Sequence, residues 1–167
     1  MPETGPLRTR VVRLDPLRPD PDIIQKAGQI LSGKKIVVFP AQCLYGLAAH
    51  ALDEAAIEAV YNLKDRPLDN PILVLVKDNP MLKTLVADLP ETAETLMKTF
   101  WPGSMTLVFN AGPRVPDLLT ARTNKIGIRI PAHPVARALV NQVDFPITGT
   151  SANLSGRPGC CRIQDLD

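Results

Sequence analysis

The stretch KKIVVFPAQCLYGLAAHALDEAAIEAVYNLKDRPLDNPILVLV, residues 34–76, indicates how the chain folds. It opens with a short apolar run at 34–40, rich in β-branched residues, which is typical of a buried strand. Asp53 is then placed to cap a helix that Pro67 ends, and 72–76 is a second buried strand. Strands and helices that alternate in this way predict an α/β domain with a mainly parallel or mixed sheet.

The rest of the chain continues the alternation. Asp20-Pro21 has the pattern of a helix start, with the aspartate as cap and the proline in the first turn. We expect extended segments at 44–52, 106–110, 126–130 and 146–150, and helices at 23–31, from 79, at 90–100 and at 133–141. The sequence therefore predicts one α/β domain (α+β by some schemes) over 21–167. A polar lead, 1–20, precedes it, with an edge strand expected at Val11–Leu14.

Composition excludes several classes of protein. The 167 residues, 45% apolar and 22% charged, can bury a core, and a net charge of +2 is too small to imply nucleic acid by itself. No apolar run is long enough to span a membrane, and three cysteines without a CxxC pair indicate neither a disulfide framework nor a metal site. We expect a soluble protein of a reducing cytoplasm, in which His50 and His133 have structural roles.

The pair Lys64 and Arg66 is the first candidate site. Pro67 disfavours a helical Arg66, so both side chains could leave the helix end in the same direction. Two adjacent cations suit a polyphosphate, because lysine supplies a point charge and arginine a planar fork. The alternative is the ordinary preference of a helix C-terminus for positive charge.

Ser151-Ala152-Asn153 directly follows a predicted buried strand. Ligands of open α/β sheets gather at strand ends, and small polar side chains there can hold phosphate or ribose. An ordinary polar turn is the alternative. Arg129 interrupts an apolar strand, so it either faces solvent or reaches a carboxylate or phosphate. Cys43 is either a small buried apolar residue or part of a pocket wall.

Five blocks together resemble the YrdC-like threonylcarbamoyl-AMP synthase family, from about residue 30 to 158. They are FPAQCLYGL (39–47), LKDRPLDNPI (63–72), FWPGSMTLVF (100–109), IGIRIPAHP (126–134) and TSANLSGRP (150–158). The resemblance implies a twisted mixed β-sheet flanked by helices, with a basic concave site. It also implies a nucleotidyltransferase that makes L-threonylcarbamoyl-AMP and pyrophosphate from L-threonine, bicarbonate and ATP. Mg²⁺ would accompany ATP, and the product would serve adenosine 37 of tRNA.

The resemblance also assigns roles to residues. Lys64 and Arg66 would be catalytic and hold the phosphates, and Ser151 and Asn153 would complete the nucleotide site. The further nucleotide-binding positions are Asn70 and Lys125, and the threonine-binding positions are Cys43, Leu75, Arg129 and Gly149. No protein-held metal is expected. Transfer of the product would involve tRNA and downstream tRNA-modification proteins.

Several positions depart from the family pattern. Cys43 stands where relatives have a threonine, and Leu75 where many have a histidine. Lys125 and Gly159 replace small polar residues. Relatives usually continue through strands that help close the site, so we expect this chain to lack a C-terminal closing segment and to bind its substrates more weakly.

Two other functions follow from the same residues. A non-catalytic RNA-binding or ribosome-associated module of the same fold would use the basic face without turnover. A paralogue that adenylates another small carboxylate or carbamate would explain Cys43 and Leu75, because apolar replacements in a hydrogen-bonding site change its specificity.

Overall fold

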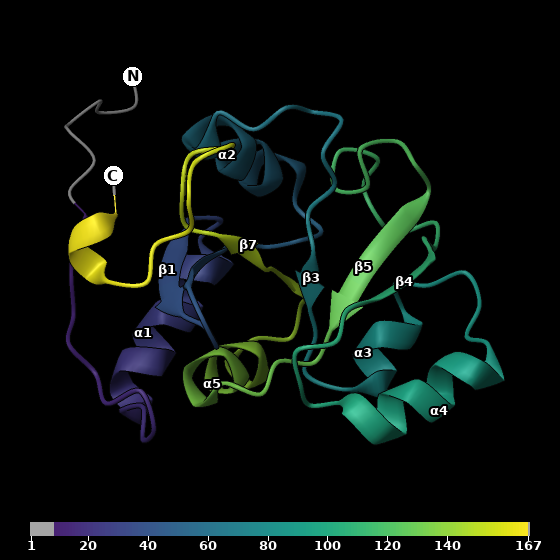
Figure 1. Ribbon diagram of the computed structural model, residues 1–167, viewed down its shortest axis with the longest axis horizontal. Coiled ribbons are helices and arrows are strands. Elements are labelled where there is room, and N and C mark those ends of the chain that lie inside the picture. The colour runs from purple at the N-terminus through teal and green to yellow at the C-terminus, as the bar shows by residue number, and fades with distance from the viewer. Residues whose placement is uncertain (1–8, 167) are drawn as a thin grey trace.

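The computed structural model describes residues 9–166, in which helices surround two small sheets (Figure 1). The helices are α1 (Pro21–Ser32), α2 (Glu54–Lys64), α3 (Asn79–Lys83), α4 (Glu91–Phe100), α5 (Pro134–Gln142) and the 3₁₀ turn η1 (Ile163–Asp165). The strands are β1 (Val37–Pro40), β2 (Tyr45–Ala48), β3 (Val74–Leu75), β4 (Leu107–Asn110), β5 (Lys125–Arg129), β6 (Ile147–Thr148) and β7 (Thr150–Ser151). The α/β prediction is thereby confirmed.

The two sheets differ in their pairing. The smaller has the order β1-β2-β7 and is antiparallel, whereas the larger has the order β4-β5-β3-β6. Within the larger sheet β3 runs parallel to β5, with Val74 opposite Ile128, and the other pairs are antiparallel. The expectation of a mixed sheet is confirmed, and that of a mainly parallel one is wrong.

The strand predicted at 146–150 is split in two. β6 belongs to the larger sheet and β7 to the smaller, and Gly149 stands between them. The hydroxyl of Thr148 accepts from the Ala49 amide at 2.9 Å and donates to the Leu47 carbonyl at 3.0 Å. Thr148 therefore ties the two sheets together at the point where the chain crosses between them.

Helix starts follow the predicted caps. The Asp20 carboxylate accepts from the Asp22 amide at 2.8 Å, and that of Asp53 from the Ala56 amide at 3.0 Å. α2 ends at Lys64, three residues before Pro67, because Asp65 adopts the left-handed conformation with φ of 47°. The end of α2 is thus set by this turn as well as by the proline.

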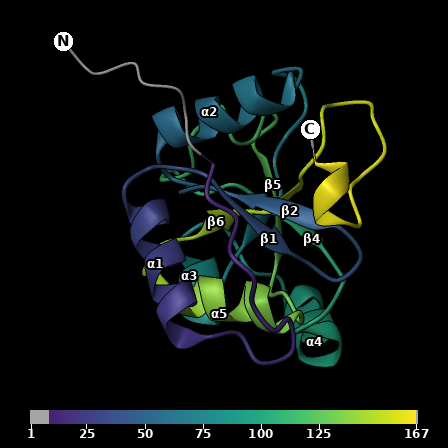
Figure 2. The ribbon, with the colours of Figure 1, turned by 90° about the vertical axis from the view of Figure 1, so that its left-hand side faces the viewer.

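Two apolar clusters form the core on opposite faces of β3. Val74 belongs to the cluster beneath α2, whereas Leu75 belongs to the cluster that α1, α5 and β1 enclose. Figures 1 and 2 show α2 on one side of the strands and α5 with α1 on the other. Adjacent strand residues point to opposite faces, so β3 separates the two clusters.

The edge strand expected at Val11–Leu14 is absent. Val11 and Val12 are exposed, and the segment pairs with no strand of residues 9–166. Of this segment, only Leu14 packs against the core. The part of the polar lead before residue 9 lies outside the described residues. No helix within 9–166 is long and apolar enough to cross a membrane.

Candidate active site

Lys64 lies buried at the end of α2, with 2% of its surface exposed. Its ammonium group donates to the carbonyl oxygen of Ser151 and, at 2.5 Å, to that of Asn153. The amide of Ser155 returns a hydrogen bond to the Lys64 carbonyl at 2.8 Å. The end of α2 is therefore joined to segment 151–155, which runs alongside it in Figure 1.

Burial shifts the titration of this lysine. Desolvation, with a smaller contribution from the nearby Arg66 guanidinium, lowers the pKa of Lys64 to about 8. The Cys160 thiol raises this pKa slightly, and no carboxylate is among the causes. The site therefore holds a cation without a carboxylate partner, as an anion-binding site requires.

Arg66 is half-buried and holds the turn that follows α2. Its Nε donates to the Asn70 carbonyl at 3.1 Å, and its Nη2 donates to the Pro71 carbonyl at 2.9 Å. The Tyr61 hydroxyl donates to the same Asn70 carbonyl at 2.8 Å. Lys64 and Arg66 thus leave the same helix end but bind different carbonyl groups, and the Asn70 side chain stays at the surface.

Two buried polar atoms beside Lys64 have no hydrogen-bond partner, Asn153 Oδ1 and Ser155 Oγ. The Asn153 amide nitrogen donates to the carbonyls of Leu154 and Arg157, both at 2.8 Å, which fixes the orientation of the side chain. An unpartnered buried polar atom costs about 1–3 kcal/mol. Segment 151–155 thus keeps two unpartnered polar atoms next to a cation.

A second group gathers on the larger sheet. Leu75 and Arg129 are paired neighbours on β3 and β5, and so share a face. A Cβ at Gly149 would lie 2.8 Å from Leu75 Cγ, so the glycine packs directly on that leucine. Three of the four predicted threonine-binding positions therefore lie together.

Arg129 is half-buried, and burial lowers its pKa. Its Nε and Nη2 both donate to Thr106 Oγ1, at 3.1 and 2.7 Å. The guanidinium is thus partly enclosed and bound to a hydroxyl, and its contact with a carboxylate or phosphate stays a prediction. Thr106 stands in the quoted block 100–109, yet sequence reasoning did not single it out, since an isolated threonine carries no pattern.

Two predicted positions stand apart from these groups. Cys43 is exposed in the loop between β1 and β2, so the interpretation of a small buried residue is wrong. Lys125 is exposed at the start of β5, where its Nζ donates to Asn110 Oδ1 at 2.5 Å on the edge strand β4. That hydrogen bond directs Lys125 to β4 and not to segment 151–155.

Both histidines have the structural contacts expected of them. His50 stacks on Phe145, with ring centroids 3.8 Å apart, and its Nδ1 accepts from the Leu52 amide. His133 Nδ1 accepts from the Val135 amide at the start of α5. Across residues 9–166, no group of three or more His, Cys, Asp or Glu side chains could hold a metal ion.

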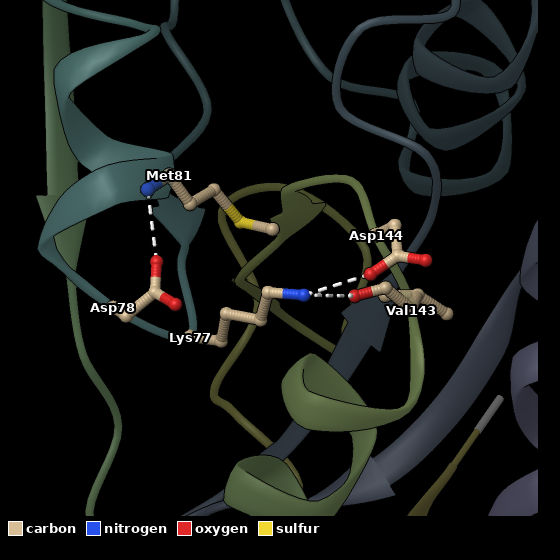
Figure 3. A network of polar contacts seen from close by, with 5 residues as sticks. All are labelled: Lys77, Asp78, Met81, Val143 and Asp144. Atoms are coloured by element: carbon tan, nitrogen blue, oxygen red, sulfur yellow. Dashed lines mark hydrogen bonds and ion pairs between the residues drawn. The ribbon is translucent and has the colours of Figure 1, made fainter.

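A cavity of about 460 Å³ between α3, α4 and α5 contains none of the predicted residues. Lys77 at its wall is paired with Asp144 at 2.8 Å, and its Nζ lies 3.5 Å from the Val143 carbonyl (Figure 3). Asp78 is engaged as the cap of α3, where it accepts from the Met81 amide at 2.8 Å. These polar groups are satisfied within the fold, unlike those of segment 151–155.

Known proteins resemble this chain over most of its length. The Sua5_yciO_yrdC family, described as "Telomere recombination", matches residues 29–167. Threonylcarbamoyl-AMP synthase of Bacillus subtilis is 43% identical over an alignment of 156 residues, which covers 89% of this chain and 44% of the relative. The protein of the same name from Pyrococcus abyssi is 42% identical over 132 residues, 79% of this chain and 38% of the relative.

A solved structure of P. abyssi Sua5 complexed with L-threonine superposes with a TM-score of 0.83 at 38% identity, covering 86% of this chain and 42% of the other. The chain thus spans less than half the length of these relatives. The match nevertheless includes both groups of candidate residues, around Lys64 and around Arg129. The chain belongs to the Sua5/YciO/YrdC family.

Proposed function

We propose that this chain carries the domain that makes L-threonylcarbamoyl-AMP and pyrophosphate from L-threonine, bicarbonate and ATP. One observation carries the proposal: buried Lys64 meets segment 151–155 where Asn153 Oδ1 and Ser155 Oγ have no partner. The Lys64 ammonium suits a nucleotide phosphate, to which the Ser155 hydroxyl can also donate, and Asn153 Oδ1, an acceptor, suits a ribose hydroxyl. The names of the relatives from B. subtilis and P. abyssi support the same activity.

The nucleotide would lie between the end of α2 and segment 151–155. Lys64 and Arg66 would hold the phosphates, with Ser151 and Asn153 on the opposite side, while Asn70 and Lys125 are outlying candidates. Lys64 and Arg66 now bind backbone carbonyls, so phosphate oxygens would compete with those carbonyls or add to them. The lysine and arginine side chains both have further N–H groups that can donate to phosphate oxygens.

The amino acid would lie on the sheet face shared by Arg129, Leu75 and Gly149. The guanidinium would bind the threonine carboxylate, and the backbone at Gly149 would line the pocket. Cys43 would approach from the β1–β2 loop. The solved complex of P. abyssi Sua5 with L-threonine, at 38% identity, supports threonine as the amino acid.

The proposed reaction requires stabilisation of negative charge more than it requires covalent catalysis. The threonine amine would attack bicarbonate and form a carbamate with loss of water, and a carbamate oxygen would then attack the α-phosphorus of ATP as the bond to pyrophosphate breaks. Negative charge grows on the phosphate oxygens, where Lys64 and Arg66 would stabilise it. Mg²⁺ would enter bound to the phosphates of ATP, the usual arrangement where a protein supplies few carboxylates. The product would pass to proteins that modify adenosine 37 of tRNA in the cytoplasm.

A second candidate function has one observation in its favour. Leu75 is 5% exposed and packs on Gly149, so the amino-acid site has an apolar wall where many relatives place a histidine. A site of this kind would accept a different small amino acid or carboxylate, which the same machinery would adenylate.

Pyrophosphate release from ATP, Mg²⁺ and bicarbonate, with and without threonine, tests both candidates. Mass detection of the acyl adenylate identifies the product, and a panel of serine, alanine, valine and glycine tests the second candidate. Threonine-dependent threonylcarbamoyl-AMP supports the main proposal. Release with another amino acid alone supports the second, and the absence of ATP binding contradicts both.

A further inference from the structure

Thr106 and Arg129 form a cross-strand pair at the amino-acid site. β4 and β5 are antiparallel with Leu107 opposite Ile128, so Thr106, directly before β4, lies opposite Arg129. Its hydroxyl oxygen accepts two hydrogen bonds from one guanidinium, from Nε at 3.1 Å and from Nη2 at 2.7 Å. One oxygen therefore fixes the plane in which the arginine fork lies.

The rest of the threonine side chain is also held. A Cβ at Gly127 would meet Thr106 Cγ2 at 3.4 Å, so the methyl group lies over the glycine on the same sheet face. A β-branched side chain has few rotamers, and this contact selects the one that turns the hydroxyl toward Arg129. The methyl thus helps to set the rotamer, whereas the hydroxyl makes the contact with Arg129.

Arg129 keeps donors for a ligand. A guanidinium has five N–H groups, and Thr106 takes only two of them. Of the residues that the structure describes, no carboxylate pairs with this half-buried cation, since its pKa shift has desolvation as its single cause. A carboxylate ligand would therefore complete the site.

We infer that Thr106 is a positioning residue of the amino-acid site, which orients the Arg129 guanidinium so that its free N–H groups receive the substrate carboxylate. The inference rests on the proposed function, because the ligand is the amino acid that this function requires. It predicts a defect in amino-acid binding and none in nucleotide binding.

Calorimetric titration of L-threonine and, separately, of MgATP into the chain tests this role with two variants. Thr106→Val keeps the methyl group and loses the hydroxyl, and it should raise the Kd for threonine about tenfold or more, the scale of a lost hydrogen bond to a charged group. Thr106→Ser keeps the hydroxyl and should bind threonine within about threefold of wild type. The Kd for MgATP and the melting temperature of both variants should stay near those of wild type.

The Arg129→Lys variant shows whether Thr106 acts by positioning the Arg129 guanidinium or by packing against the sheet. Lysine has no fork to orient, so adding Thr106→Val to Arg129→Lys should cost no further threonine affinity. Threonine binding that Thr106→Val leaves unchanged, or equal losses for threonine and MgATP, would overturn the role of Thr106 while the proposed function stands. A wild-type chain that binds MgATP but none of the small amino acids would overturn the proposed function, and the role of Thr106 with it.

Discussion

The ammonium group of Lys64 lies 2.5 Å from the carbonyl oxygen of Asn153, a residue 89 positions further along the chain. This contact joins the pair at the end of α2 to the polar segment after β6, the two motifs that the family resemblance assigns to one nucleotide site. It also means that Lys64 has two tasks, because the cation that would face phosphate also holds the segment that would bind the nucleotide.

Arg66→Ala should leave folding nearly intact and lower pyrophosphate release at least ~100-fold, the scale of losing one preorganised charge contact. The arginine is only half-buried, and its present partners are backbone carbonyls at the surface turn. Arg66→Lys is the matched control, since it keeps the charge without the fork. A large fall in melting temperature for Arg66→Ala would show instead that the residue is structural.

Lys64→Met should destabilise the fold by about 2–3 kcal/mol, because it leaves the buried carbonyls of Ser151 and Asn153 without their donor. Urea unfolding measures the loss. Leu63→Met, at the adjacent exposed position, is the control and should change the free energy of unfolding by less than about 0.5 kcal/mol. Equal stability of Lys64→Met and wild type would contradict the stabilising role of these two hydrogen bonds.

The stability that Lys64 contributes should rise with pH above about 8. Its pKa falls from an ordinary 10.5 to about 8 on folding, so between these values the unfolded chain binds more protons than the folded one. The free energy of unfolding of wild type, measured relative to that of Lys64→Met, should therefore increase between pH 7 and pH 9.5. A flat difference over this range would place the lysine pKa outside it.

Activity should show the opposite pH dependence. Only the protonated ammonium can stabilise charge on a phosphate, so kcat/KM should fall as pH rises through about 8. Lys64→Arg stays charged throughout this range and should lose that limb of the profile, whatever its overall rate. If kcat/KM of Lys64→Arg still falls as pH rises through about 8, a titratable group other than Lys64 causes the fall.

Gly149→Ala should cost about 1–3 kcal/mol of stability and weaken threonine binding, because the new methyl group would overlap the Leu75 side chain. Leu75→Val in the same chain should restore part of both losses by making room. Gly33→Ala offers a control, since its Cβ would make only ordinary contacts at 3.4 Å and its φ is −78°. Thermal melting and threonine titration of wild type, Gly149→Ala, the double variant and Gly33→Ala test this prediction.

Local signals made much of the fold readable from the sequence. The caps at Asp20 and Asp53 were predicted because a carboxylate satisfies amides two or three residues away, within one turn of chain. The apolar runs around Val74 and Ile126 marked buried strands for the same local reason. Strand direction was not readable in this way, since pairing joins residues far apart in sequence.

By itself the sequence determined the α/β alternation, the helix starts and the five family blocks, because each depends on residues that are near neighbours in the chain. Only the tertiary structure decided what these residues touch. Packing buried Lys64 against carbonyls 87 and 89 residues away, exposed Cys43, and placed Thr106 against Arg129. It also divided the strand at Gly149, where the Leu75 side chain leaves no room for a Cβ. Such contacts arise from the fit of side chains in three dimensions, which no spacing along the chain encodes.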